Sequence, residues 1–137
     1  LAKVEVLSQD NQKGDFVLYM VLDFPFPLKD RDVIVKGKIS KDANGVVSVK
    51  NKAITQGKAL NPDYIRLKNY QGDWSFQALA NNKVKITTSG YADPEGSIPL
   101  SVANMFVQQQ PYQMLQKMKK KKKKPNKKFA ELPAILR

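Results

Sequence analysis

The stretch FPFPLKDRDVIVKG, residues 24–37, joins a proline-rich loop to the beginning of a strand. Pro25 and Pro27 each remove a backbone donor and favour extended geometry at Phe24 and Phe26. The segment is therefore predicted to be a loop, yet its side chains are aromatic rather than polar. An apolar loop has to cover an apolar surface, and the sequence on either side of it indicates which one.

Alternation of apolar and polar residues predicts β-strands on both sides of this loop. The predicted strands are residues 3–6, 15–23, 33–40, 47–53, 64–80 and 83–91. The fifth is long, and Gln71–Asp73 in its middle predicts a bulge or bend, whereas Asp42–Gly45 is typical of a hairpin turn. Short turns, with nothing helical between the strands, predict an antiparallel meander with one apolar face and one lysine-rich face.

After Tyr91 a helical period replaces the alternation. Ser97 or Ser101 is the expected N-cap, with Pro99 in the first turn, and Pro111 is expected to kink the helix. A helix of about twenty residues is long enough to lay an apolar stripe on the sheet. The sequence therefore predicts an α+β fold.

Composition limits the chemistry that the chain can perform. It has 137 residues, which suits one domain, and it contains no cysteine and no histidine. Thiolate nucleophiles, thiolate metal sites, disulfides and the commonest general base are therefore excluded. The missing cysteines leave the cellular compartment undecided. Because Leu1 already lies at the start of a predicted strand, the sequence suggests a fragment, a processed chain or a truncated form.

Three motifs in a fixed order make the sequence recognisable. They are Arg31–Asp32 after the aromatic-proline loop, Ile65–Arg66 followed by Gly72–Trp74, and Asp93–Pro99 at the entry to the helix. In these motifs the chain resembles the START family, the steroidogenic-acute-regulatory-related lipid-transfer domains, from about residue 2 to residue 118. The resemblance implies a helix-grip fold. In that fold a curved antiparallel β-sheet grips a long kinked C-terminal helix, and a hydrophobic tunnel lies between them.

The resemblance also implies how the chain is divided. Residues 1–118 correspond to the C-terminal part of such a domain, and residues 119–137 form a Lys-rich tail. The N-terminal helix and the first three strands of the family have no counterpart here. Because those strands pair with the last strand in the family, residues 83–91 are expected to form an open edge. A second chain or the missing N-terminal segment is the expected partner of that edge.

By the same resemblance, the expected function is non-catalytic binding, and transfer, of a hydrophobic ligand in the tunnel, without a cofactor. Phe24, Phe26 and Leu28 are expected to form the lid that the family calls the omega loop. Ligand pockets are mostly apolar with a few polar anchors, and the anchors expected here are Arg66, Tyr70, Thr88, Asn104 and Gln109. The residues expected to contact the ligand are Leu18, Met20, Leu22, Phe24, Phe26, Val35, Ile39, Arg66, Trp74, Phe76, Thr88, Val102, Met105, Phe106 and Gln109. The alternative interpretation of these residues is an ordinary core.

The ligand stays open between a fatty acid, another lipid with acyl chains and a phospholipid. Some sterol-binding relatives carry a buried acid and an arginine on the strands that flank the omega loop. This chain has Leu18 and Gly37 in that region, which argues against sterol-type recognition. Arg31 and Asp32 are interpreted as members of a structural ion pair, with Arg66 or Asp93 as the partner, rather than as catalytic groups.

Two other functions remain as alternatives: a helix-grip enzyme of the cyclase or hydrolase type, and a nucleic-acid-binding or scaffold protein that uses the basic tail. The enzyme would need an ionisable group inside the tunnel, where the inward positions hold no acid. Much of the net charge of +12 comes from the tail. The lysine run within the tail has three possible interpretations. It fits contact with an anionic membrane surface, binding to the phosphates of a nucleic acid, or simply a tail that is solvated. The residues of the run are Lys119, Lys120, Lys121, Lys122, Lys123 and Lys124. No nucleic acid is expected, because the body of the chain has no nucleic-acid-binding motif.

Overall fold

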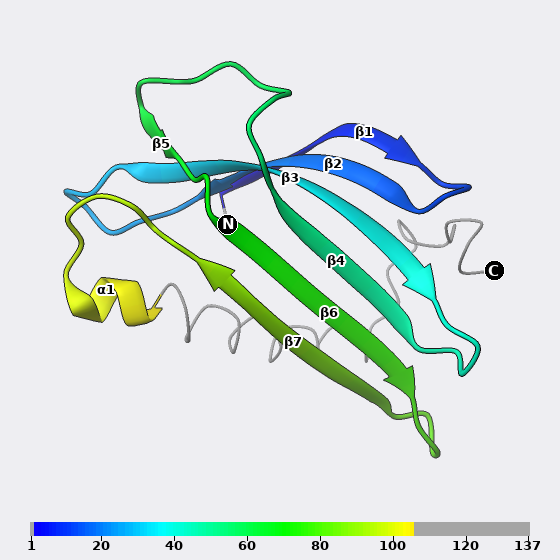
Figure 1. Ribbon diagram of the computed structural model, residues 1–137. Coiled ribbons are helices and arrows are strands. Elements are labelled where there is room, and N and C mark those ends of the chain that lie inside the picture. Colours follow the sequence, from blue (N-terminus) through cyan, green and yellow to red (C-terminus); the bar gives the residue numbers. More distant parts are fainter. Residues whose placement is uncertain (1, 106–137) are drawn as a thin grey trace.

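The computed structural model describes residues 2–105 as one twisted β-sheet followed by a short helix (Figure 1). The elements are β1 (Lys3–Asp10), β2 (Asp15–Leu22), β3 (Asp30–Lys41), β4 (Val47–Ile54), β5 (Tyr64–Arg66), β6 (Tyr70–Ala78), β7 (Val84–Ala92) and α1 (Leu100–Asn104). The strand order is β1-β2-β3-β4-β6-β7, and every neighbouring pair on this path is antiparallel. The antiparallel arrangement and the approximate strand positions predicted from the sequence are confirmed.

The hairpins follow from local turn chemistry. In the β3–β4 turn, the Asp42 carboxylate accepts hydrogen bonds from the backbone N–H groups of Asn44 and Val46. Gly45 there has a φ of 82°, a conformation that costs glycine little. This confirms the hairpin predicted at Asp42–Gly45. The β6–β7 turn instead uses Asn81 and Asn82 in left-handed conformations, which asparagine tolerates better than most residues.

The predicted strand 64–80 is two strands, and the break falls at residues 67–69 rather than at Gln71–Asp73. β5 leaves the meander and pairs in parallel with β3. The Leu67 N–H then donates to the carbonyl of Asp32 at 2.8 Å, and the Leu67 side chain is fully buried. Gln71–Asp73 lies in regular register within β6. The correction has a physical cause, since burial of Leu67 turns the chain at that point.

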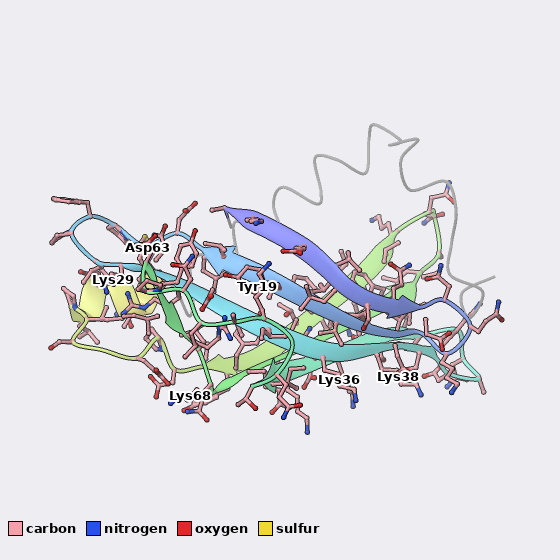
Figure 2. All side chains as sticks on the ribbon, turned by 90° about the horizontal axis from the view of Figure 1, so that it is seen from above. Tyr19, Lys29, Lys36, Lys38, Asp63 and Lys68 are labelled. Carbon is pink, nitrogen blue, oxygen red and sulfur yellow. The ribbon has the colours of Figure 1, made fainter. Side chains whose placement is uncertain are left out.

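The sheet has a hydrophobic cluster on each face, and we name the faces by what they carry. On the first, the apolar face, Val33, Val35 and Leu67 are buried against half-buried side chains of β2, β4 and β6. On the second, the lysine face, a smaller cluster of Tyr19, Val21 and Ile34 lies at the end of the sheet that carries β5. Figure 2 shows Lys36 and Lys38 projecting side by side from this second face. The predicted division into an apolar and a lysine-rich face is confirmed by the register.

The helix begins as the sequence indicates but is capped differently. Pro99 occupies the N-cap position of α1, and no side chain caps the helix. The prediction that Ser97 or Ser101 caps it is therefore wrong. The rest of the predicted helix, with its kink at Pro111, lies outside the described residues. Within residues 2–105, no helix is long and apolar enough to cross a membrane.

Candidate functional site

The apolar face presents rows of side chains that cross the sheet from strand to strand. One row runs through Leu18, Val35 and Ala53. A second row runs through Ile39 and Val49, then through Trp74 and Thr88. Directly paired residues of antiparallel strands share a face, so these positions form one continuous surface. Most of its side chains are half-buried rather than fully buried.

Between these two rows lies a row in which three of the five residues are glycines. It consists of Phe16, Gly37, Asn51, Gly72 and Gly90, one residue from each of β2, β3, β4, β6 and β7. A Cβ on Gly37 would lie 2.2 Å from the Phe16 ring, and one on Gly90 would lie 2.6 Å from the carbonyl of Gln71. Only glycine fits at such positions. We call this row the glycine row; the Phe16 ring lies over Gly37, and the Asn51 amide lies over Gly72.

Aromatic side chains of β6 border the glycine row on both sides, with Tyr70 before Gly72 and with Trp74 and Phe76 after it. The rings of Trp74 and Phe76 stack with centroids 6.2 Å apart and planes 9° apart. Tyr70 precedes them on the same face of β6, and burial raises the pKa of its hydroxyl. A tyrosine hydroxyl is protonated at neutral pH at its ordinary pKa, and burial favours this neutral form further. Together these rings supply flat apolar area with one polar group at the end.

The loop between β2 and β3 is held at its base and exposed at its tip. Phe24 is 9% exposed, and the Arg31 guanidinium lies 4.4 Å from the centre of its ring. The Phe24 N–H donates to the Asp30 carboxylate at 2.8 Å. Phe26, two residues on, is 97% exposed. The two phenylalanines therefore differ in exposure: Phe24 anchors the loop, and Phe26 is available to another molecule.

Arg31 joins this loop to the turn that precedes α1. Its guanidinium donates to the carbonyls of Pro94 at 2.9 Å and Glu95 at 2.7 Å, and also to the carbonyl of Lys29. The side chain is 2% exposed, and this burial lowers the pKa of Arg31 from its usual value. Its partners are carbonyls beside Asp93 rather than the Asp93 carboxylate. Three oriented dipoles therefore replace the solvation of the buried charge.

Asp32 forms the structural ion pair that the sequence predicts, with Arg66 as the partner. The Arg66 Nε donates to Asp32 Oδ1 at 2.9 Å, and a terminal nitrogen donates to Oδ2 at 3.1 Å. The Tyr19 hydroxyl donates to Oδ2 at 2.7 Å. Asp32 is 1% exposed, and its hydrogen bond is the main reason why the pKa of Arg66 is raised. The arrangement holds β5 against β3 and offers no free ionisable group for catalysis.

The same network makes stability depend on pH in the alkaline range. Burial, together with the hydrogen bond to Asp32, raises the pKa of Tyr19 from 10.0 to about 12. The unfolded chain therefore loses this proton near pH 10, and the folded protein near pH 12. The contribution of Tyr19 is fully present below pH 10 and is lost as pH rises through 12.

Denaturant unfolding at pH values on both sides of this window measures the effect. Wild type is expected to lose stability relative to the Tyr19→Phe variant only above pH 10. A Tyr91→Phe variant, which alters an exposed tyrosine, is the control and should follow wild type. Parallel curves for wild type and Tyr19→Phe would contradict the assignment.

Apart from Phe24 and Phe26 of the loop, the predicted contact residues fall into four groups in the structure. On the apolar face lie Leu18, Met20, Leu22, Val35, Ile39, Trp74, Phe76 and Thr88. Arg66 is placed differently from the prediction, because Asp32 holds its guanidinium on the lysine face and the carbonyls of Lys58 and Ala59 take its remaining donors. Val102 and Met105 are half-buried in and beside α1. Phe106, Gln109 and the run Lys119–Lys124 lie outside the described residues.

The lysine face carries an open groove of about 460 Å³. Lys36 is paired with Lys52, and Lys38 is paired with Lys50, across β3 and β4. Asp15 and Asp73 line the groove with them. The described ion pairs of residues 2–105 involve none of these side chains. The groove is thus a solvated charged surface and differs in chemistry from the apolar face.

Asn51 is a polar residue that the sequence interpretation of this face passed over. Its Oδ1 is buried and has no hydrogen-bond partner. The sequence did contain this information, since strand alternation puts Asn51 on the same face as Val47, Val49 and Ala53. An asparagine at an inward position of an otherwise apolar strand identifies a polar spot on that face.

Comparison with known proteins gives a family for the chain. A family model described as "START domain" matches residues 1–128. An uncharacterized protein from Pseudomonas aeruginosa is 30% identical over 114 residues, which are 83% of this chain and 55% of that protein. The chain therefore spans about half the length of this curated relative.

Two solved structures have a similar fold. A STAR-related lipid transfer protein fragment from Xanthomonas axonopodis has a TM-score of 0.71 and 24% identity, with 84% of this chain and 63% of that chain covered. Human STARD10 has a TM-score of 0.73 and 23% identity, with 86% of this chain and 48% of that chain covered. At these identities the likeness establishes the fold.

Proposed function

Because this chain belongs to the START domain family, we propose that it binds a lipid on its apolar face and transfers it between membranes. The ligand is held without covalent chemistry, in a tunnel between the sheet and the chain that follows α1. Lipids with acyl chains, either fatty acid or phospholipid, suit this continuous apolar surface. The observation that carries the proposal is one apolar face, continuous over six strands, whose residues are mostly half-buried.

Exposure at the ends of the apolar face supports a ligand rather than a closed core. Val4 and Val6 of β1 are paired with Met20 and Leu18 and are about half exposed. Val84 of β7 is 43% exposed. Each CH₂ group moved out of water contributes about 0.8 kcal/mol, so a sixteen-carbon chain offers on the order of 10 kcal/mol before ordering costs. Binding of the lipid chain also removes the apolar surface of the protein from water.

The distribution of carboxylates supports a non-catalytic role. The strand register of the described residues assigns every strand carboxylate to the lysine face. These residues are Glu5, Asp10, Asp15, Asp30, Asp32 and Asp73. With histidine and cysteine absent from the sequence, general acid–base chemistry on the apolar face would depend on other groups. Binding alone needs none of them.

The proposal also covers the partners of the protein. In the described sheet, β7 is the last strand, and its outer backbone groups face away from β6. We propose that an N-terminal segment or a second chain pairs with this edge. Lys119–Lys124 are proposed to contact anionic membranes, which attract basic segments by about 1 kcal/mol per residue. Pairing would complete the sheet at β7, and the basic run would hold the ligand-binding face close to a membrane with which lipid is exchanged.

Organic extraction and native mass spectrometry of the protein purified from cells test lipid binding. A bound lipid is the expected result. Thr87 and Thr88 provide a matched pair, because Thr88 is opposite Trp74 on the apolar face and Thr87 is opposite Ser75 on the lysine face. Thr88→Glu should abolish the bound lipid, since it puts a charge into the ligand site, whereas Thr87→Glu should retain it. A folded protein that neither carries lipid nor takes it from phosphatidylcholine vesicles would overturn the proposal.

Phe26 is expected to control transfer rather than affinity. It is exposed at the tip of the loop that enters β3, where it can enter the membrane interface. Phe26→Ser should slow transfer of a pyrene-labelled phospholipid between vesicles by about tenfold, because burial of a Phe side chain contributes roughly 1.5–3 kcal/mol. The amount of bound lipid should stay unchanged. Leu60→Ser, which removes another exposed apolar side chain, is the control and should transfer at the wild-type rate.

A further inference from the structure

Four lysines form a compact array in the middle of the lysine face. Lys36 and Lys38 lie two residues apart on β3, and Figure 2 shows both projecting from this face. Their direct partners on β4 are Lys52 and Lys50. Directly opposite residues have Cβ atoms about 5 Å apart, and alternate residues of one strand are about 7 Å apart. We call Lys36, Lys38, Lys50 and Lys52 the lysine quartet.

The quartet is an unfavourable arrangement as long as its charges have no partner. Like charges directly opposite each other on neighbouring strands are destabilising, and the quartet contains two such pairs in succession. Within residues 2–105, the lysine ammonium groups that donate hydrogen bonds belong to Lys29 and Lys58, which lie outside the quartet. Lysines often protect the edge strands of a sheet, but β3 and β4 are the central pair in the strand order. A negatively charged group from outside the chain explains the quartet best.

Acids balance one half of the quartet and limit the size of that group. Asp15 of β2 lies opposite Lys38, and Asp73 of β6 lies opposite Lys50. The row therefore runs from acid through two lysines to acid across four strands. A broad anionic surface laid on this row would meet both acids as well as both lysines. A compact anion at the centre would meet the lysines first.

The other half of the quartet has no acid beside it. Val17 lies opposite Lys36, and Gln71 lies opposite Lys52, so the two positive charges of this row are not balanced within it. The open groove of about 460 Å³ extends over both rows, and its lining includes Gly37. Because Gly37 contributes only backbone, the ammonium groups on either side can converge above it. The groove therefore has room for an anion and has its excess positive charge at Lys36 and Lys52.

We propose that the lysine quartet binds a phosphate monoester group, with Lys36 and Lys52 as its main partners. This group carries nearly two negative charges at neutral pH and has three acceptor oxygens, so it can contact several ammonium groups at once. Lysine binds phosphate as a compact point charge with three donors. The phosphate can belong to a small soluble molecule or to a lipid headgroup such as that of phosphatidic acid. The quartet lies on the face opposite the apolar one, so binding there does not depend on the proposed lipid site.

Titration of the full chain with glycerol 3-phosphate, followed by amide chemical shifts at low salt, tests the site. Shifts are expected in residues 36–38 and 50–52. Dimethyl phosphate, a diester with one charge, should bind about fivefold more weakly or less tightly still. A variant with both Lys36→Gln and Lys52→Gln should bind glycerol 3-phosphate about tenfold more weakly than wild type, because two ion pairs to one phosphate are lost.

A matched variant controls for net charge. Lys83→Gln combined with Lys85→Gln removes the same charge from two exposed lysines that do not line the groove. This control should bind glycerol 3-phosphate as wild type does. Equal loss of affinity in the two double variants, or equal affinity of wild type and the Lys36 and Lys52 variant, would overturn the assignment of the quartet.

Vesicles distinguish the two sources of the phosphate once glycerol 3-phosphate is seen to bind. If a lipid headgroup is the source, phosphatidylcholine vesicles that contain phosphatidic acid should bind wild type more tightly than the Lys36 and Lys52 variant. If a soluble molecule is the source, the vesicles should bind both proteins equally. The run Lys119–Lys124 is present in both proteins, so its own contact with the membrane does not affect the comparison.

Thermal unfolding gives an independent measurement of the same site. Without ligand, the Lys36 and Lys52 variant should unfold about 2 °C above wild type, because a pair of like charges is removed. Glycerol 3-phosphate should raise the midpoint of wild type and leave that of the variant unchanged. An equal rise in both proteins would contradict the proposed site.

The amount of lipid extracted from the purified protein separates this site from the proposed function. It should be the same in wild type and in both double variants. Extractable lipid without phosphate binding would overturn the phosphate site alone. Phosphate binding without any bound lipid would overturn the proposed function alone.

Discussion

Replacing Asp32 with alanine is expected to destabilise the protein by about 3–5 kcal/mol, the usual cost of removing one partner from a buried ion pair. The variant leaves the Arg66 guanidinium without its carboxylate and the Tyr19 hydroxyl without its acceptor. Domains of this size are typically stable by about 5–15 kcal/mol. The substitution should therefore remove a large fraction of the free energy of unfolding, and the protein should be partly unfolded at 37 °C.

Urea unfolding measures the effect, and a second substitution shows its cause. Combining Asp32→Leu with Arg66→Met should recover most of the lost stability, because no buried charge is then left unpaired. Glu5→Gln is the control, since it weakens the half-exposed pair of Glu5 and Lys58, whose nitrogen and oxygen are 2.9 Å apart. Its effect is expected to be small. A loss in Asp32→Ala no larger than in Glu5→Gln would contradict the role of the buried network.

Replacing Arg31 with methionine is expected to lower the free energy of unfolding by about 3 kcal/mol or more, because buried carbonyls then lose their donor. Methionine keeps much of the apolar stem that packs on Phe24. The carbonyls of Pro94 and Glu95 lose the contact that joins their turn to the loop before β3. Arg31→Lys should restore little, since a lysine cannot reproduce the planar set of donors.

Hydrogen exchange gives the local readout for Arg31→Met. Faster exchange should appear in residues 23–30 and 93–96, while the centre of β6 remains protected. Bound lipid should also leave faster, because the loop and the turn beside α1 are no longer tied together. Lys29→Met is the control, since within residues 2–105 its ammonium donates only to the carbonyl of Pro62, at an exposed position. Uniformly faster exchange would instead indicate global loss of stability.

The sheet could be predicted from the sequence because its signals are local. Alternation fixes which residues share a face, and Asp42–Gly45 fixes a turn through its own side chain and one glycine. The division of residues 64–80 could not be predicted in this way. The break depends on Leu67 finding a buried position next to Val33 and Val35, which lie more than thirty residues earlier. The parallel pairing of β5 is likewise a tertiary effect.

The candidate site shows the same limit. Parity along each strand was enough to place Leu18, Trp74 and Thr88 on one surface. It was not enough for Arg66, because the short β5 belongs to a parallel pair and Asp32 decides where the guanidinium lies. The position of Asn51 between glycines of two neighbouring strands is likewise known only from the register. The family resemblance supplied the fold and the expected class of ligand, which composition left open.

The last strand of the sheet has a consequence for self-association. Lys83 and Lys85 are exposed at the start of β7, on the edge that β6 leaves open. Lysines on an edge strand deter pairing with another copy of the same strand, since like charges meet. A segment with acidic residues meets no such repulsion. Concentrated salt screens these charges, so edge-to-edge oligomers should form first in solutions of high ionic strength.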